Sequence, residues 1–184
     1  MSSQQIIAGV KATRAELLML KKRKALAQRG HDLLVEKRDA LLMHFFEIIR
    51  EIGPLRQKLN EALMNAYRAF AKARLISGFA KIEEVSMGMP ERFEVSERRR
   101  SIIGVPAPIF EVSIKEKPEG GWWYGVSGTS AALDDAIKAM DEAIRALVDL
   151  AEAESAAKRL AEAIISTKRR VNALEYIIIP RFDA

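Results

Sequence analysis

The sequence predicts a mainly α-helical fold: a long antiparallel two-helix coiled-coil hairpin with a small β-hairpin insert at the turn end. Three observations lead to this prediction. Apolar residues recur every three or four positions along two long segments. Ala, Leu, Glu, Lys and Arg, most of which favour helix, dominate the composition. Between the two segments the periodicity stops, and Gly, Pro and β-branched residues become frequent.

The first periodic segment, 10–79, predicts one very long helix. Steps of three and four residues from Val10 meet mostly apolar positions as far as Ile76. Such sustained periodicity is typical of a coiled coil, and at 1.5 Å per residue it would extend for about 100 Å. We expect a bend and not an end at Pro54, because the apolar register continues beyond it.

Three polar residues interrupt the apolar stripe of this helix. Lys24, His31 and Arg38 occupy the same heptad position in successive heptads. Two interpretations remain open: long side chains that reach water from a loosely packed seam, or residues that specify the register or contact an acidic partner.

The second periodic segment, 130–179, predicts the other long helix. Thr129 or Ser130 can cap its start, and Asp134 and Asp135 lie in its first turn, where the helix dipole favours acids. We expect Pro180 to kink or end this helix near Ile179. Residues 180–184 then form a short tail.

The insert, 80–129, predicts strands instead. The stretch 109–115 alternates apolar and polar residues, 116–121 has turn chemistry, and 122–126 is a second candidate strand. Together they predict a β-hairpin at about 109–126. Residues 93–95 are a candidate third short strand.

The insert connects two helices long enough to pack on each other, so we expect them to run antiparallel. Residues i and j then face each other where i + j is roughly 210. Under this rule the end far from the insert is basic on both helices. Residues 1–60 hold twelve Lys/Arg against six Asp/Glu, and residues 158–181 hold six against two. Nearer the insert, residues 134–154 hold two Lys/Arg against seven Asp/Glu.

Composition and motifs argue against chemistry in this chain. It has no Cys and only two His, His31 and His44, which do not share a helix face. It lacks a phosphate-binding loop and a run of 18 apolar residues. We therefore expect no catalytic, cofactor-binding or metal site, no membrane insertion and a cytosolic protein.

Two kinds of surface remain as candidate binding sites. The basic runs at 21–24 and 168–170 are either a solvated helix face, a nucleic-acid surface or a match to an acidic protein cavity. The last is favoured, because no aromatic residues are interleaved for base stacking. Trp122, Trp123 and Tyr124 are either the small core of the insert or anchors for a partner.

Two stretches carry a resemblance to a known family. TRAELLMLKKRKALAQRGHDLLVEKRDALLMHFFEII (13–49) and TKRRVNALEYIIIPR (167–181) resemble the D subunit of the archaeal and vacuolar-type (A-type/V-type) rotary ATP synthases, the central-stalk protein. The motifs cover about 50 residues near both ends of the chain, whereas the middle matches in layout alone.

The resemblance implies a non-catalytic rotor, or axle, that transmits torque between an ion-driven membrane ring and a catalytic head. It implies that the basic end enters the ring of A and B subunits. It also implies that the small F subunit and the funnel-shaped C subunit dock at the insert end, on the cytoplasmic face of the membrane. The candidate contacts with the head are basic: Arg14, Lys21, Lys22, Arg23, Arg38, Arg169 and Arg170. Gly30, Lys37 and Asn172 join them as head or seam residues, and Trp122, Trp123 and Tyr124 are the candidate contacts at the insert end.

This chain departs from the family at its C-terminus. Members usually continue helically for some tens of residues beyond the IIP motif, whereas this sequence stops at Ala184. We therefore expect a truncated tail at 180–184. The alternative functions are a coiled-coil nucleic-acid-binding arm, which predicts RNA binding that weakens steeply with salt, and a tethering protein, which predicts self-association.

Overall fold

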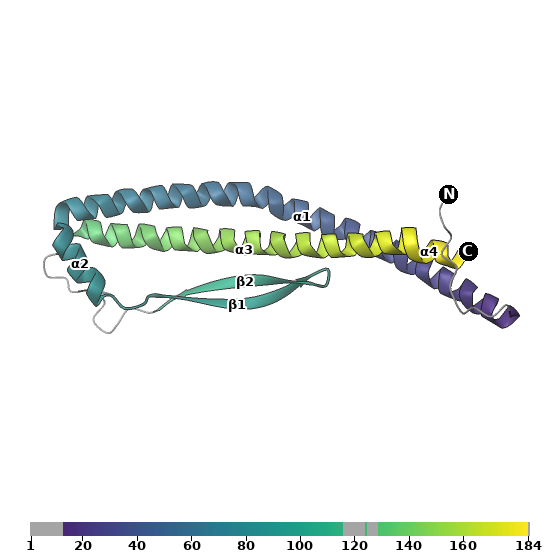
Figure 1. The fold of residues 1–184 in the computed structure, drawn as a ribbon. Coiled ribbons are helices and arrows are strands. Elements are labelled where there is room, and N and C mark those ends of the chain that lie inside the picture. The colour runs from purple at the N-terminus through teal and green to yellow at the C-terminus, as the bar shows by residue number, and fades with distance from the viewer. Residues whose placement is uncertain (1–12, 116–123, 125–128, 184) are drawn as a thin grey trace. The chain divides into compact units, whose positions relative to one another are not determined.

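The structure, a computed structural model, describes residues 13–115, 124 and 129–183. Its elements are the helices α1 (Arg14–Ser77) and α2 (Phe79–Gly88), the strands β1 (Phe93–Ile102) and β2 (Val105–Ile114), then helix α3 (Ala131–Ala173), a π-helical turn η1 (Leu174–Ile178) and the short helix α4 (Ile179–Asp183) (Figure 1). The predicted fold class is confirmed: two long helices flank a small antiparallel β insert.

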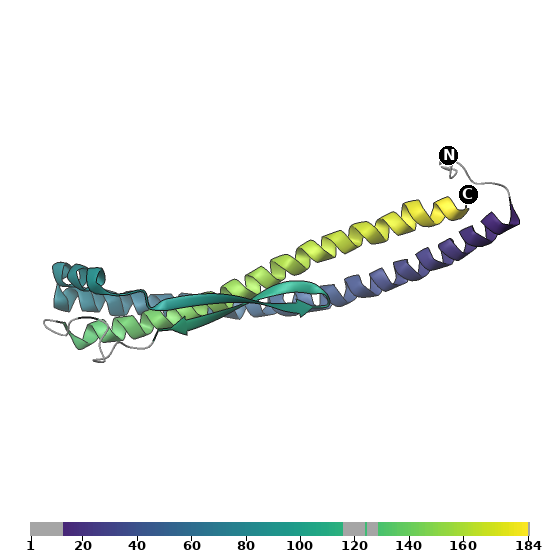
Figure 2. The ribbon, with the colours of Figure 1, turned by 90° about the horizontal axis from the view of Figure 1, so that it is seen from below.

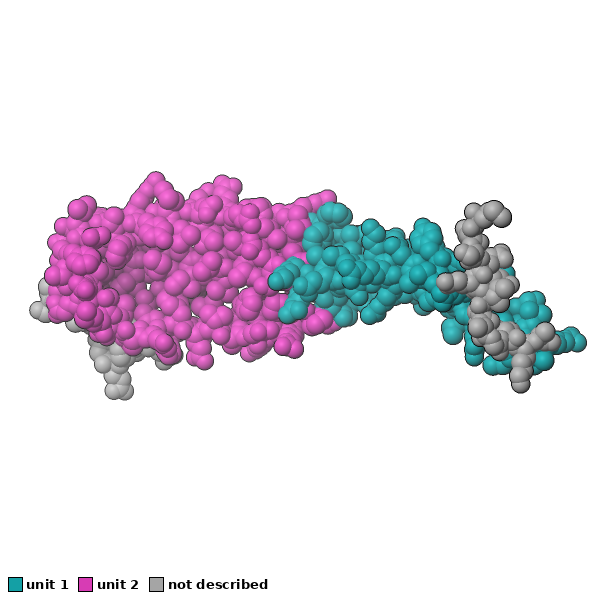
Figure 3. All heavy atoms as spheres, in the orientation of Figure 1, with its two compact units in different colours: residues 1–47, 102–105, 158–184 teal, residues 48–101, 106–157 magenta. Residues whose placement is uncertain are grey.

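The chain divides into two compact units, and each is described by itself (Figure 3). Unit 1 comprises residues 1–47, 102–105 and 158–184. Unit 2 comprises residues 48–101 and 106–157. Each unit contains a part of α1 and a part of α3, which lie side by side (Figure 1, Figure 2).

In unit 2, three contacts fix the direction of the two helices. The Arg56 guanidinium lies 2.8 Å from Glu154, Lys58 Nζ lies 3.1 Å from Asp149, and the hydroxyl oxygens of Ser77 and Ser130 are 3.2 Å apart. The residue numbers of these pairs add up to about 210, so the antiparallel register predicted from the sequence is confirmed. Small residues fill much of the seam: Ala66, Ala73, Ala132, Ala136, Ala143 and Ala146 are buried.

Unit 1 has the same antiparallel arrangement. Lys24 forms an ion pair with Asp183, and His31 Nε2 lies 3.9 Å from a Glu175 carboxylate oxygen. Leu41 and Leu160 are fully buried at 0% exposure, and Val171 is nearly so. A fully buried leucine side chain stabilises a fold by about 1.5–3 kcal/mol, so these two residues anchor the seam of this unit.

The hairpin that the structure describes in the insert is formed by β1 and β2. The predicted strand 109–115 is confirmed as a strand, because β2 covers most of it, and its described neighbour is β1. Ile103 and Gly104 form the two-residue turn with φ of 50° and 76°, the left-handed pair that matches the twist of a tight hairpin. The candidate strand 93–95 is the start of β1, whereas 122–126 lies, apart from Tyr124, outside the described residues.

The sequence missed α2 entirely. This helix follows Gly78, whose φ of 78° breaks α1, and its Ile82 and Val85 pack on a cluster that includes Ala73, Ala132 and Leu133. Helix α2 thereby covers the seam of unit 2 next to the end of α1.

Pro54 and Pro180 both lie within helical backbone. Helix α1 continues through Pro54, as expected. Near Pro180 the helix does not end: it widens into η1, where the Ile179 N–H donates to the Leu174 carbonyl, and α4 follows. Because proline has no N–H and its ring collides with a carbonyl one turn earlier, a wider π-helical turn is a way to keep the chain helical.

Candidate partner-binding surfaces

The predicted basic contacts lie in unit 1, and most are accessible. Arg38 is half-buried and its guanidinium lies 2.8 Å from the neighbouring Asp39 carboxylate. The other six are exposed: Arg14, Lys21, Lys22, Arg23, Arg169 and Arg170.

These residues do not gather in a single patch. The Lys24–Asp183 and His31–Glu175 contacts set the register of unit 1, and this register places Arg38 opposite Lys168 and Arg169. Lys21, Lys22 and Arg23 lie at or beyond the end of α4 by the same register. At 1.5 Å per helical residue, the two groups are separated by about 24 Å along α1.

Exposed apolar side chains lie among the bases on α1, a feature that the sequence analysis did not single out. Met19, Leu26 and Leu33 are 51%, 71% and 66% exposed and lie one heptad apart, so they share one helix face. Leu17 and Leu18 are exposed beside them. A surface that combines Met, Leu and Arg is typical of contacts with protein. The signal was present in the sequence as a second apolar stripe outside the seam.

The polar seam positions have carboxylates within reach, two of them on the opposite helix. Lys24 pairs with Asp183, and His31 lies between Asp32, 3.1 Å from its Nδ1, and Glu175, 3.9 Å from its Nε2. Arg38 would meet Lys168 by the same register, and its guanidinium instead forms an ion pair with the neighbouring Asp39. The interpretation that these positions specify register is favoured at Lys24 and His31.

Three further candidates of the seam and head lie close to these. Gly30 is half-buried on α1, and Asn172 is exposed on α3. Lys37 lies near the tip of the β-hairpin, since a Cβ added at Gly104 would be 3.6 Å from its Nζ. Lys37 thus lies beside the hairpin turn within unit 1.

At the insert end, Trp122 and Trp123 lie outside the described residues, and Tyr124 is used internally. The Tyr124 hydroxyl donates to Asp134 Oδ1 at 2.6 Å, and its ring packs on the apolar cluster of α1 and α3. Burial raises the pKa of Tyr124 well above its usual range, and the hydrogen bond and negative charge of Asp134 raise it further.

Two other carboxylates of α3 hold the insert. Arg92, just before β1, contacts Asp141 at 2.7 Å, and both side chains are largely buried, at 9% and 20% exposure. The backbone N–H of Phe110 in β2 donates to Glu152 at 3.0 Å. Asp134, Asp141 and Glu152 are spaced by seven and eleven residues and therefore share one face of α3. Three carboxylates of this acidic helix therefore contact residues of the insert.

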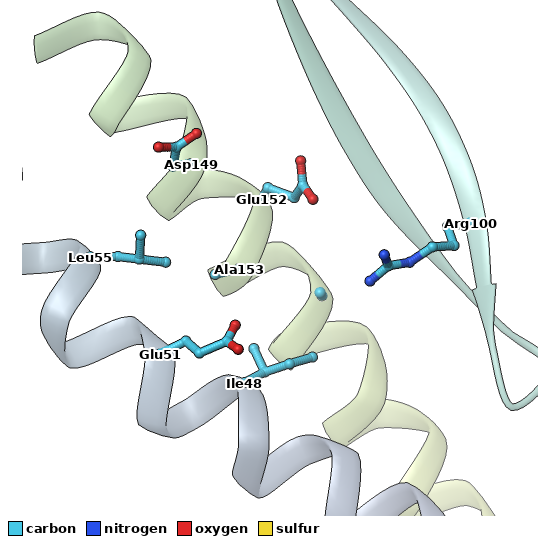
Figure 4. A pocket seen from close by; sticks show the side chains of 8 residues that line it. Ile48, Glu51, Leu55, Arg100, Asp149, Glu152 and Ala153 are labelled. Atoms are coloured by element: carbon cyan, nitrogen blue, oxygen red, sulfur yellow. The ribbon is translucent and has the colours of Figure 1, made fainter. Parts of the chain in front are cut away.

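A hollow of about 230 Å³ lies next to these contacts in unit 2 (Figure 4). Ile48, Glu51 and Leu55 line it from α1, Asp149, Glu152, Ala153 and Ala156 line it from α3, and Arg100 reaches toward it from β1. Asp149 already accepts from Lys58 and Glu152 from Phe110. Among the residues that the structure describes, no group of His, Asp or Glu is arranged to hold a metal ion. In the same described part of the chain, no helix has the length and apolar character to cross a membrane.

Comparison with known proteins gives the family of the chain. The model of the family of the ATP synthase D subunit matches residues 16–184. The chain belongs to the ATP synthase D-subunit family. It is 45% identical over 175 residues to an A-type ATP synthase D subunit from Thermococcus kodakarensis, a match that covers 95% of this chain and 82% of that one. It is 44% identical over 181 residues to the corresponding protein from Methanopyrus kandleri, a match that covers 98% and 78% of the two chains.

A third relative, from Pyrococcus furiosus, is 45% identical over 174 residues, covering 94% of this chain and 80% of the relative. As a member of the D-subunit family, the chain is a component of an ATP synthase, an enzyme complex built from different kinds of protein chain. The surfaces described above are therefore surfaces of one part of an assembly.

Proposed function

We propose that the chain is the central-stalk rotor of an A/V-type ATP synthase, which transmits torque between a membrane ion-driven ring and the catalytic head. The observation that carries this proposal is the antiparallel pairing of α1 with α3 in both units, in a member of the ATP synthase D-subunit family. A shaft must resist twisting, and a packed seam between two helices, as each unit has, resists it better than single helices do.

The seam has the properties that such a shaft needs. Leu41 and Leu160 fill it in unit 1, and alanines allow close approach in unit 2. Ion pairs such as Arg56–Glu154 at 2.8 Å run across it. A slip of one helix by a turn would break these pairs and expose the leucines. In this proposal, the fixed register of the two helices is what lets the shaft transmit torque.

The A and B subunits of the head are the proposed partners of the exposed Lys and Arg residues of unit 1. Its exposed Lys and Arg side chains suit an acidic collar, and long flexible bases can exchange partners as a shaft turns. The F and C subunits are proposed to dock at the insert end. The chain itself supplies no active site in this proposal and acts as a peripheral component on the cytoplasmic face of the membrane.

Reconstitution of the ATP synthase in membrane vesicles tests the proposal. Without this chain, we expect weak ATP hydrolysis by the head and no ATP-driven ion transport. Full coupling between hydrolysis and transport in the absence of the chain would refute the rotor function.

Charge reversal tests the head surface separately. Arg169→Glu combined with Arg170→Glu should weaken binding to the isolated A/B head at least tenfold and reduce the dependence of binding on salt. The matched control, Lys138→Glu with Arg145→Glu, reverses two exposed charges on α3 in unit 2 and should leave head binding unchanged. Equal losses in both variants would show that total charge, not this surface, governs the contact.

A further inference from the structure

The two edges of the β-hairpin differ, and the register of the strands reveals how. The turn at Ile103 and Gly104 places Ile102 opposite Val105. At the other end, the Lys115 N–H donates to the Arg92 carbonyl at 2.9 Å, which fixes the same register. The even-numbered residues of β1 and the odd-numbered residues of β2 therefore bond across the hairpin. The odd residues of β1 and the even residues of β2 point their backbone groups outward.

The outer edge of β2 is closed to another strand. Its first two outward positions are Pro106 and Pro108, which have no N–H to donate. The third is Phe110, whose N–H already donates to Glu152 of α3 at 3.0 Å. Proline on an edge and coverage by a helix are two of the ways in which proteins block edge-to-edge pairing.

The outer edge of β1 has neither protection. Its outward positions are Phe93, Val95, Glu97, Arg99 and Ser101, and each keeps its N–H. Residues 94–101 are all exposed. In the described part of the chain the sheet has two strands, so β1 has β2 as its neighbour on one side and an open row of donors and acceptors on the other.

Positive charge gathers in the half of β1 that is nearer the turn. Arg98, Arg99 and Arg100 follow one another there, with Glu94 and Glu97 before them. Arg98 is 71% exposed and 3.2 Å from Glu111, and Arg99 is 80% exposed and 3.7 Å from Glu97. Because side chains alternate between the faces of a strand, these arginines place positive charge on both faces. Such an edge repels a basic strand and attracts an acidic one.

We propose that the open edge of β1 is a docking site for an extended, acidic segment of another protein in the assembled ATP synthase. The segment adds to the hairpin as a third strand. The outward amides of Val95, Glu97, Arg99 and Ser101 bond to its backbone, and the exposed Arg98 and Arg99 select its acidic side chains. This interaction does not depend on torque transmission, since a stationary or a rotating component could use it.

Amide hydrogen exchange tests the proposal in the chain alone and in the assembled complex. The expected signature is alternation: the odd-numbered amides 95, 97, 99 and 101 slow at least tenfold on assembly. The even-numbered amides that bond to β2 are protected in both states. Unchanged exchange of the odd amides would overturn the proposal, and so would equal slowing of odd and even amides, which would indicate general burial.

Two matched variants separate backbone pairing from side-chain contact. Ser101→Pro removes one outward N–H, just as Pro106 does on the opposite strand, and should abolish the protection. Ser101→Ala loses the same hydroxyl but keeps the N–H and should retain it. Protection of the even amides in Ser101→Pro shows that the hairpin still folds. If the two variants behave alike, strand addition is refuted.

The chemistry of the partner has its own tests. Arg99→Glu keeps the outward N–H but reverses the charge, so the protection should fall at least tenfold. Unchanged protection would refute an acidic segment. Sedimentation of the isolated chain checks a second copy as the occupant, because dimers that form in wild type and vanish in Ser101→Pro would replace the proposed partner with self-pairing.

Discussion

The buried ion pair between Arg92 and Asp141 offers a sharp test of how the insert is held on α3. The pair is 2.7 Å apart, with side chains only 9% and 20% exposed. Asp141 Oδ1 is also buried and has no hydrogen-bond partner among the described residues, so this carboxylate depends on Arg92. Replacing Arg92 by Met keeps an apolar side chain of similar length and removes the charge.

Loss of one member of a buried pair costs about 3–5 kcal/mol, because the remaining charge is left without compensation. Each 1.4 kcal/mol is a tenfold change, so opening of the insert should become about two to four powers of ten more frequent. Native-state hydrogen exchange of the even-numbered amides of β1 measures this opening directly.

The matched control is Arg98→Met. Arg98 pairs with Glu111 at 3.2 Å, but the two side chains are 71% and 49% exposed, so its loss should cost about 0–1 kcal/mol. Adding Asp141→Leu to Arg92→Met replaces both charges by apolar groups and should recover most of the stability. Equal exchange rates in Arg92→Met and Arg98→Met would refute the reasoning that this pair seats the insert.

Three further predictions concern other parts of the chain. Leu160→Ala should lower the free energy of unfolding by about 3–5 kcal/mol, because Leu160 is 0% exposed. Leu147→Ala should lower it by less than about 1 kcal/mol, because Leu147 is 50% exposed. Urea unfolding of the two variants distinguishes these outcomes. Gly104→Ala should destabilise the hairpin by about 1–2 kcal/mol, since the φ of Gly104 is 76°. Gly30→Ala should stabilise the chain by about 0.5–1 kcal/mol, because an added Cβ would meet nothing within 4 Å. A loss of stability in Gly30→Ala would contradict the second prediction. The pKa of Tyr124 is raised in the folded chain, so its contribution to stability is complete below about pH 10 and declines above it. The wild type should therefore lose stability above about pH 10 more steeply than Tyr124→Phe. Identical pH profiles of the two proteins would refute this contribution.

The helices could be predicted from the sequence because each depends on a pattern that is local or periodic. The apolar stripe of α1 continues through Pro54, and the chain follows it. The antiparallel register followed from symmetry about the insert and agrees with contacts such as Lys58–Asp149 at 3.1 Å. Pairing of two regular helices leaves few alternatives once their lengths are known.

The strand pairing could not be predicted in the same way. Strand β1 contains three consecutive arginines and lacks clear alternation, and its turn, Ile103-Gly104, lacks the Asn-Gly or Asp-Gly signal of a tight hairpin. The stretch 116–121 has stronger turn chemistry, so it drew the prediction toward 109–126. Helix α2 was missed because ten residues contain too few turns to establish a period.

The sequence predicted the charge of the candidate surfaces but not the contacts that their residues make. The exposed bases of unit 1 are evident in the sequence, and six of the seven are exposed. The contacts between the insert and α3 are not evident in the sequence. Asp141 bonds to Arg92, 49 positions earlier, and Glu152 bonds to Phe110, 42 positions earlier. Contacts between distant positions in sequence depend on the fold, and no local pattern encodes them.

The contacts that hold the insert on α3 and the open edge of β1 both follow from one arrangement of the insert. Glu152 accepts from the outward N–H of Phe110, so α3 covers the same edge of the hairpin that the prolines already close. Covering that edge leaves β1 with the free backbone groups, and the arginines of β1 lie on that strand. If partner docking used the face of the sheet instead, nothing would require both prolines and Glu152 to fall on outward positions of β2. That coincidence of position is the reason to look for the partner along β1.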